Sequence, residues 1–241
     1  RLSALVKLAD FPTTKEIQTV VASLSRNPAQ RSDPWLAEAV NLLARRHGVQ
    51  LHREGPNLLP NAGLETLAAD GLPEGWKRRD YGDRPANREA TWSSVSSAGE
   101  AHGGQRAVRC VATGGEADTS LYANVTLKTN TPYRLAGWVR GKGVRGRLSF
   151  NDHLNRVETE RVTKDGDWSE VEVVFNSGNA TRGSINILFV ARGEGTFDDV
   201  RLVELLPVED SSTRVAAGDV VLGEHIFFKH AAACVFCHQL R

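Results

Sequence analysis

The feature that most constrains the fold is the alternation of apolar and polar residues along the middle of the chain. In the stretch TSLYANVTL the apolar positions Leu121, Ala123, Val125 and Leu127 fall on every second residue. Successive side chains of a strand point to opposite faces, so this spacing places all four on one face. The stretch SINILFVA is apolar at nearly every residue, as expected of a strand that is buried on both faces.

Segments rich in glycine or aspartate separate these runs and predict turns. They are Gly114-Gly115, Gly141-Lys142-Gly143, Lys164-Asp165-Gly166-Asp167 and Gly193-Glu194-Gly195. Many short strands with turns at this spacing predict an all-β antiparallel sandwich over residues 55–206.

Residues 1–54 have the helical period instead. The segment TTKE matches a capping box with Thr13 as the N-cap. Asp33 followed by Pro34 marks a second helix start, and Gly48 marks its end. Two or three short helices cannot bury their apolar faces alone, so we interpret the segment as the end of a HEAT-like helical repeat with earlier repeats before it. It shows no catalytic chemistry and is expected to be a scaffold.

Near the end of the chain, Cys234-Val235-Phe236-Cys237-His238 forms a C-x-x-C-H motif. In such a motif the two thiols add to the vinyl groups of haem, and the histidine becomes the proximal iron ligand. A structural zinc site would need a second ligand pair, and a thioredoxin-like pair would need a βαβ setting; the sequence offers neither. Cys234 and Cys237 are therefore predicted to hold haem c covalently, with His238 as the axial iron ligand.

The residues before the motif support this prediction. Residues 207–218 are polar enough to be a linker, and residues 219–241 have the pattern of one amphipathic helix that runs into the cysteines. GEHIFFKHAAACVFCH resembles the opening of class I cytochromes c, which implies the first helix of an all-α cytochrome c domain, truncated here. His225 and His230 are too close in sequence to His238 to reach the opposite haem face, so the sixth iron ligand is not expected in this chain.

Charge and composition argue against several partners. The 30 Lys and Arg residues nearly balance the 29 Asp and Glu residues, which argues against nucleic acid or an anionic membrane as a partner. No apolar run approaches the length of a transmembrane segment. The chain has no methionine and no signal peptide at Arg1, which we interpret as an internal fragment of a longer protein. Cys110 stands alone in RAVRCVA and is expected to be a small buried hydrophobe.

The stretches NLLPNAGLE, GLPEGW and GTFDDVRLVEL resemble the first and last strands of carbohydrate-binding modules with a galactose-binding-like jelly roll. The resemblance covers about Asn57 to Leu205. It implies that Glu65 and Asp198 help to hold a structural calcium ion, with Leu64 in place of the usual aromatic residue. Asp198 is also in phase with apolar residues that should face the core, and a buried carboxylate needs a metal or hydrogen-bond donors. Calcium and an ordinary hydrogen-bonded aspartate both remain open.

Sugar-binding modules stack aromatic rings on sugars, and three aromatic residues that fall on predicted strands are candidates: Trp92, Tyr122 and Trp138. Trp138 shares a face with Arg134 and Arg140, which places it away from the core. Packing within the sandwich is the alternative role for all three.

Two acidic pairs, Glu158 with Glu160 and Asp165 with Asp167, would suit a glycosidase. They lie in a turn-rich polar stretch, where solvated loop charges explain them better. No catalytic residue is therefore predicted in this chain.

The order of helices, sandwich and ACVFCH resembles the C-terminal half of the PVC-type haem-binding CxxCH proteins, in which a sugar-dehydrogenase-like β-propeller precedes helical repeats. This resemblance implies the haem c-binding, electron-transfer part of a larger, sugar-oxidising dehydrogenase, with carbohydrate and a redox protein as partners. Because haem is attached to this motif outside the bacterial cytoplasmic membrane, a periplasmic or other extracytoplasmic location is expected. The alternative is a non-catalytic carbohydrate-binding or scaffold protein with no functional haem.

Overall fold

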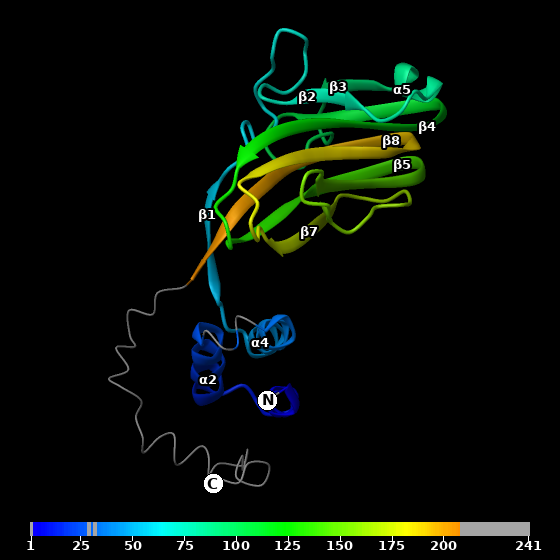
Figure 1. The fold of residues 1–241 in the computed structure, drawn as a ribbon. Helices are drawn as coiled ribbons and strands as arrows, with labels where there is room; N and C mark the ends of the chain where they lie inside the picture. Colours follow the sequence, from blue (N-terminus) through cyan, green and yellow to red (C-terminus); the bar gives the residue numbers. More distant parts are fainter. Residues whose placement is uncertain (1, 28–29, 31–32, 208–241) are drawn as a thin grey trace, which may run out of the picture. The chain divides into compact units, whose positions relative to one another are not determined.

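A computed structural model of the chain describes residues 2–27, 30 and 33–207 (Figure 1). The chain divides into two compact units, one of which spans Glu54–Leu206, while the other contains the helices that precede it. The cysteine motif and nearly all of the predicted linker lie outside the described residues, so the structure carries no information on the cytochrome prediction.

The N-terminal unit is helical, as predicted. Its described helices are α1 (Leu2–Leu8), α2 (Lys15–Arg26) and α4 (Pro34–His47). Asp33 Oδ1 accepts hydrogen bonds from the backbone N–H groups of Trp35 and Leu36 at 2.9 and 3.2 Å, which confirms it as the N-cap of α4. Gly48 ends this helix in the left-handed region, with φ of 65°. That these helices end a HEAT-like repeat stays a prediction.

The predicted N-cap of α2 is wrong by one residue. Thr14, and not Thr13, accepts the capping hydrogen bond, from the backbone N–H of Ile17 at 3.3 Å. Thr13 Oγ1 lies instead 3.2 Å from Nδ1 of the buried His47. Two adjacent threonines offer the same pattern, and only the backbone geometry distinguishes them. In the part of the chain that the structure describes, no helix has the length and hydrophobicity needed to cross a membrane.

The unit Glu54–Leu206 is built from β-strands and one short helix. In chain order its elements are β1 (His52–Asn57), β2 (Lys77–Asp80), α5 (Pro85–Glu89), β3 (Thr91–Val95), β4 (Ala107–Thr126), β5 (Pro132–Asp152), β6 (Val157–Glu158), β7 (Ser169–Asn176) and β8 (Arg182–Pro207). The hydrogen-bonded order is β2-β4-β8-β5-β6, while β1 pairs with β8, β3 with β4 and β7 with β5. The long strand β8 pairs antiparallel with both β4 and β5. β4 pairs antiparallel with β2 and β3, and β5 pairs antiparallel with β6 and β7. The predicted antiparallel class is therefore confirmed.

The strands β4, β5 and β8 are long enough to curl and contribute to both layers of the sandwich (Figure 1). Register shifts between Ala112 and Ala117 in β4 and between Lys142 and Arg145 in β5 mark the corners. The glycine-rich segments at 114–115, 141–143 and 193–195 thus lie inside strands, and the prediction of turns there is wrong. Glycine serves a bulge or a tight corner as readily as a turn, so the composition does not distinguish them.

Two layers result from this folding. Layer one contains β3, β7 and the segments 107–112, 132–142 and 193–207, whereas layer two contains β2, β6 and the segments 117–126, 145–152 and 182–191. One core fills the space between them, where the rings of Phe150 and Phe197 meet edge-on with centroids 5.9 Å apart. The predicted inward face of TSLYANVTL is confirmed, because each of its four apolar residues is buried in this core.

Candidate functional site

Two of the predicted site residues, Glu65 and Asp198, meet at the glycine-rich loop 101–106. Asp198 Oδ2 accepts hydrogen bonds from two successive backbone N–H groups of this loop, at 2.8 and 3.1 Å. Glu65 Oε1 accepts hydrogen bonds from two further loop amides, at 2.9 and 3.3 Å. Gly104 makes this approach possible, because a Cβ atom there would lie 1.8 Å from Glu65 Oε1. The two carboxylates, which lie far apart in the sequence, therefore hold the same loop in place.

Asp198 is fully buried, as its phase in the strand predicts. Burial raises the pKa of this carboxyl to about 6, although its backbone hydrogen bonds with Gly103, Asp199 and His102 act in the opposite direction. Both carboxylate oxygens accept N–H groups, since Oδ1 accepts the amide of Asp199 at 2.7 Å. These contacts are those expected of a hydrogen-bonded buried aspartate.

Calcium prefers several hard oxygen ligands, which carboxylates and loop carbonyls provide. Glu65 and Asp198 have the required chemistry and share a loop. However, the oxygens of Asp198 face N–H donors, and the described residues contain no group of three or more His, Cys, Asp or Glu side chains arranged for a metal ion. The calcium site stays a prediction.

Of the three aromatic candidates, Trp92 lies in the core. Its side chain is only 7% exposed and packs against Phe189 and Phe197, with ring centroids 6.4 and 6.0 Å away. Its indole N–H donates to Thr119 Oγ1 at 3.1 Å. Trp92 therefore has no ring face to offer a sugar, and its predicted role in stacking is replaced by packing.

Trp138 lies on the outer side of layer one and is half-buried. The imidazole of His102 stacks on its ring with centroids 3.7 Å apart and an interplanar angle of 14°. Trp168 approaches the same imidazole edge-on, and the guanidinium of Arg140 lies 4.9 Å from the Trp168 ring centroid. One face of Trp138 is thus already covered by the protein.

Tyr122, the third aromatic candidate, belongs to a different surface. In layer two, ten polar side chains that point away from the core form a set that we call the polar face: Arg79, Tyr81, Ser120, Tyr122, Ser149, Asn151, His153, Glu158, Ser184 and Asn186. They come from β2, β4, β5, β6, β8 and the residues directly after β2 and β5. Strand pairing alone brings them together, because they lie far apart along the chain.

Asn186 is the centre of the polar face and is fully buried. Its Oδ1 accepts hydrogen bonds from Tyr81 Oη at 3.3 Å and Ser120 Oγ at 3.1 Å, and its Nδ2 donates to Asn151 Oδ1 at 2.8 Å. The ring of Tyr81 also meets that of His153, with centroids 5.2 Å apart. The network fixes the orientation of an aromatic ring and an amide before any ligand arrives.

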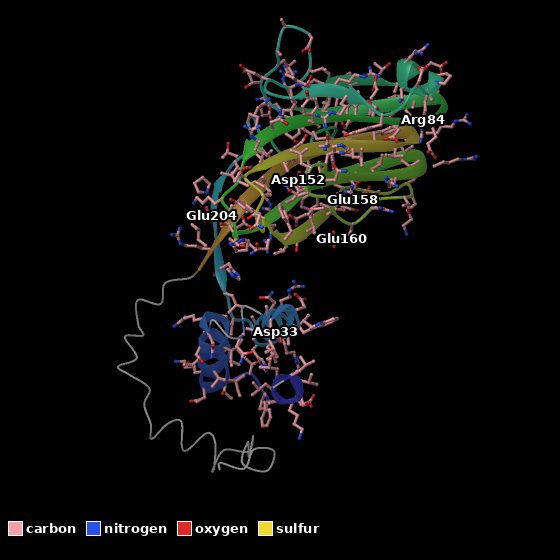
Figure 2. The ribbon with its side chains drawn as sticks, viewed as in Figure 1. Asp33, Arg84, Asp152, Glu158, Glu160 and Glu204 are labelled. Atoms are coloured by element: carbon pink, nitrogen blue, oxygen red, sulfur yellow. The ribbon has the colours of Figure 1, made fainter. Side chains whose placement is uncertain are left out.

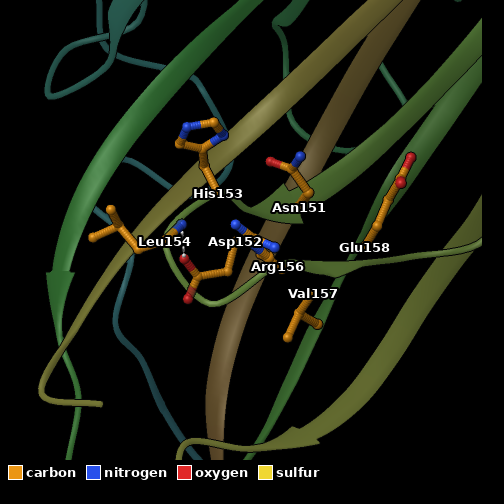
Figure 3. A pocket seen from close by; sticks show the side chains of 7 residues that line it. All are labelled: Asn151, Asp152, His153, Leu154, Arg156, Val157 and Glu158. Atoms are coloured by element: carbon orange, nitrogen blue, oxygen red, sulfur yellow. Dashed lines mark hydrogen bonds between the residues drawn. The ribbon is translucent and has the colours of Figure 1, made fainter.

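An open pocket of about 460 Å³ adjoins this network at the β5–β6 hairpin (Figure 3). Its lining residues are Asn151, Asp152, His153, Leu154, Arg156, Val157 and Glu158. The buried carboxylate of Asp152 shapes the hairpin by accepting hydrogen bonds from the amides of Leu154 at 3.1 Å and Ser184 at 3.0 Å. Figure 2 shows Asp152 and Glu158 labelled on this part of the sandwich.

Glu158, at the edge of the pocket, stays ionised at neutral pH. Burial acts to raise the pKa of this carboxyl, but hydrogen bonds from Arg161 and Ser149 outweigh it and hold the pKa below its usual range. The Ser149 hydroxyl donates to Glu158 Oε1 at 2.9 Å, and Arg161 donates to both oxygens at 2.7 and 3.0 Å. Glu158 can therefore accept hydrogen bonds from a ligand, whereas a general acid would need a raised pKa.

Most residues of the polar face were not predicted from the sequence. A usable signal was present in SINILFVA, where Ser184 and Asn186 interrupt an apolar run on alternate residues. Ser120 and Tyr122 repeat the same spacing in TSLYANVTL. Polar residues on alternate positions of two paired strands indicate a polar surface that faces away from the core and can bind a ligand. Of the three predicted aromatic residues, Tyr122 lies on this surface.

Comparisons with known proteins give partial likenesses to solved structures. No family model matches the chain, and no curated protein matches it. TmCBM61, solved in complex with β-1,4-galactotriose, is similar over 62% of this chain and 99% of its own, with 24% identity and a TM-score of 0.45. The CBM22-1 xylan-binding domain of Paenibacillus barcinonensis Xyn10C is similar over 65% and 99%, with 13% identity and a TM-score of 0.40. The K1 cleaved adhesin domain of Lys-gingipain from Porphyromonas gingivalis is similar over 63% and 99%, with 16% identity and a TM-score of 0.42.

Proposed function

We propose that the unit Glu54–Leu206 is a carbohydrate-binding module and that the polar face of layer two is its binding surface. The observation that supports this most is the buried Asn186, which holds Tyr81 and Asn151 in fixed orientations beside an open pocket. Sugars present apolar ring faces and many hydroxyl groups, so their binding needs aromatic rings and pre-oriented hydrogen-bonding side chains together. The polar face contains both.

The pocket supplies the hydrogen-bonding part of this surface. The ionised Glu158 accepts hydrogen bonds, and the Asn151 amide and His153 imidazole can orient hydroxyl groups. Because Asn186 already organises the neighbouring side chains, less conformational entropy is lost when a sugar binds.

The test is electrophoresis of the whole 241-residue chain through native gels that contain soluble polysaccharides. We expect at least one polysaccharide to retard the chain. Tyr122→Ala should then weaken binding by about threefold to tenfold, since it removes the ring that supports the Arg79 guanidinium on the polar face, whereas Trp138→Ala in layer one should leave affinity unchanged. Retardation that depends on Trp138 and not on Tyr122 would place the site elsewhere, and no retardation in a broad panel would contradict the proposal.

A second proposal concerns the segment beyond the described residues. The C-x-x-C-H motif at Cys234–His238 supports covalent haem c and a role in electron transfer, next to a sugar-oxidising activity located elsewhere in a longer protein. A redox protein partner and an extracytoplasmic location belong to the same proposal. It depends on the motif alone and is independent of carbohydrate binding by the sandwich.

A further inference from the structure

The polar face contains Arg79, an arginine that does not pair with a carboxylate of the described residues. Many arginines of the sandwich form ion pairs with carboxylates, as Arg134 does with Glu54 at 2.8 Å. Arg79, on β2, does not: among the residues that the structure describes, no carboxylate lies within ion-pair distance of its guanidinium. Its charge is therefore available to an anion from outside the chain.

The position of Arg79 is well defined. Its guanidinium carbon lies 3.8 Å from the centroid of the Tyr122 ring, and its Nη1 donates to Ser184 Oγ at 3.4 Å. Stacking on an aromatic face holds the planar guanidinium in place. Ser184 and the side chains of Tyr81 and Tyr122 are hydrogen-bond partners of some of its N–H groups, and the remaining N–H groups can donate to a ligand. The arginine is half-buried, so its charge is screened less than that of a fully exposed side chain.

Ser184 connects Arg79 to the pocket. Its hydroxyl accepts from Arg79, its carbonyl accepts the amide of His153 at 2.9 Å, and its own amide donates to Asp152 at 3.0 Å. Ser184 in β8 therefore contacts the Arg79 guanidinium on one side and the pocket residues Asp152 and His153 on the other. A ligand that occupies the pocket and extends across β8 would reach Arg79.

The charges around the pocket also favour an anion. The negative charge of its acidic residues is offset within the protein, because Glu158 pairs with Arg147 at 3.5 Å and Arg161 at 2.7 Å, and Asp152 is buried in hydrogen bonds. Arg156 lines the pocket and forms no ion pair within the described part of the chain. The positive charges of Arg79 and Arg156 are thus left without an acidic partner.

We infer that the polar face recognises sugars that carry an acidic group, either a uronate carboxylate or a sulfate ester, through the guanidinium of Arg79. This inference rests on the proposed carbohydrate binding. A planar guanidinium donates two parallel hydrogen bonds to a carboxylate or a sulfate, which a neutral sugar cannot match. The ring of Tyr122 lies against Arg79 and keeps that donor edge in a fixed direction.

The experiment measures the affinity of the whole chain for four polymers by native gel electrophoresis and calorimetry. Polygalacturonate carries carboxylates, dextran sulfate carries sulfates, galactan is neutral, and poly-L-glutamate is a polyanion without sugar. The variants are Arg79→Gln and Arg79→Lys, with Arg201→Gln as the matched control. Arg201 is an arginine of layer one that pairs with Glu170, so its loss lowers the net charge equally without altering the polar face.

We expect one or both acidic polysaccharides to bind more tightly than galactan and poly-L-glutamate. The polymer that binds distinguishes a carboxylate from a sulfate. Arg79→Gln should weaken that binding about tenfold or more, and Arg79→Lys should weaken it less, while Arg201→Gln should not change it. The selectivity of the unaltered chain tests the inference even if an Arg79 variant folds poorly.

Three results would overturn the inference, and they differ in whether they also reject carbohydrate binding. Equal or tighter binding of galactan, insensitive to Arg79→Gln, would reject acidic sugars but keep carbohydrate binding. If poly-L-glutamate bound as tightly as the acidic polysaccharides, the polar face would attract negative charge without recognising sugar. Failure of every polysaccharide to bind would reject the proposed function as well.

Discussion

At the scale of single residues, the loop 101–106 shows how a buried charge is accommodated. Asp198 lies on the side of β8 that faces the core, where burying a carboxylate without hydrogen-bond donors would cost free energy of folding. Backbone N–H groups from the loop and from Asp199 satisfy both of its oxygens. The exposed Glu65 accepts two more amides of the same loop, so the loop is held from both sides.

Calcium is the first prediction at this scale. If Glu65 and Asp198 share an ion, the folded chain should melt at a higher temperature in millimolar calcium than in chelator. The gain is about 2.7 kcal/mol when free calcium is a hundred times its dissociation constant. Asp198→Ala should remove most of the difference between the two melting temperatures, whereas Asp199→Ala should keep it. Identical melting curves for the unaltered chain would show that N–H groups alone satisfy Asp198.

The second prediction concerns pH and the same aspartate, in chelator. Its folded pKa, about 6, lies above the ordinary value of 3.8. Between these values the folded chain binds a proton that the unfolded chain releases, so the free energy of unfolding falls by up to about 3 kcal/mol as the pH rises from about 4 to 6. Urea titrations at pH 4.5 and 7 should show this loss in the unaltered chain relative to Asp198→Asn. A difference between the two proteins that does not vary with pH would refute it.

At the scale of elements, the corners of β4, β5 and β8 determine the sandwich. Each corner lets one strand pass from one layer to the other without ending. Gly193 in β8 has a φ of +113°, and a Cβ atom there would lie 2.4 Å from the carbonyl oxygen of Gly143 in the neighbouring β5. The corner therefore requires glycine on both conformational and steric grounds.

Gly193→Ala is accordingly expected to lower the free energy of unfolding by roughly 1–3 kcal/mol, through backbone strain and the close contact. The matched control is Gly166→Ala, because Gly166 has open space around it and lies in a loop. This control should change stability by no more than about 0.5 kcal/mol. Denaturant unfolding of both variants provides the measurement, and equal stabilities would mean that the corner does not depend on Gly193.

These elements also show what could be predicted from the sequence. The inward face of TSLYANVTL follows from an alternation that needs only local geometry, and Leu121 and Leu127 are buried as predicted. The corners could not be told from turns, because glycine suits both. The polar face was missed because Arg79, Asn151 and Asn186 meet only through the order in which strands pair, and that order is not a local property.

At the scale of the whole molecule, the sandwich and the cysteine motif make independent contributions. The sandwich carries the proposed sugar-binding surface within Glu54–Leu206. The motif at Cys234–His238 carries the haem prediction in residues outside the described part. Either can be correct without the other, so each needs its own measurement.

For haem, the protein should be expressed with a c-type maturation system in a bacterial periplasm. A denaturing gel stained for haem should show a coloured band, because the thioether bonds survive denaturation. Cys234→Ser combined with Cys237→Ser should abolish the stain. A colourless band at full length would end the cytochrome interpretation and leave the carbohydrate-binding or scaffold alternative.

The most direct test of the central claim is to map where a sugar binds. Backbone amide chemical shifts of the labelled chain would be recorded with and without oligosaccharides of the polysaccharide that retards it most. Sugar binding at the polar face predicts that the largest changes fall on β2, on β4 around Tyr122 and on the β5–β6 hairpin around His153. Changes confined to the loop 101–106 and the surroundings of Trp138 would place the site on layer one and contradict the account.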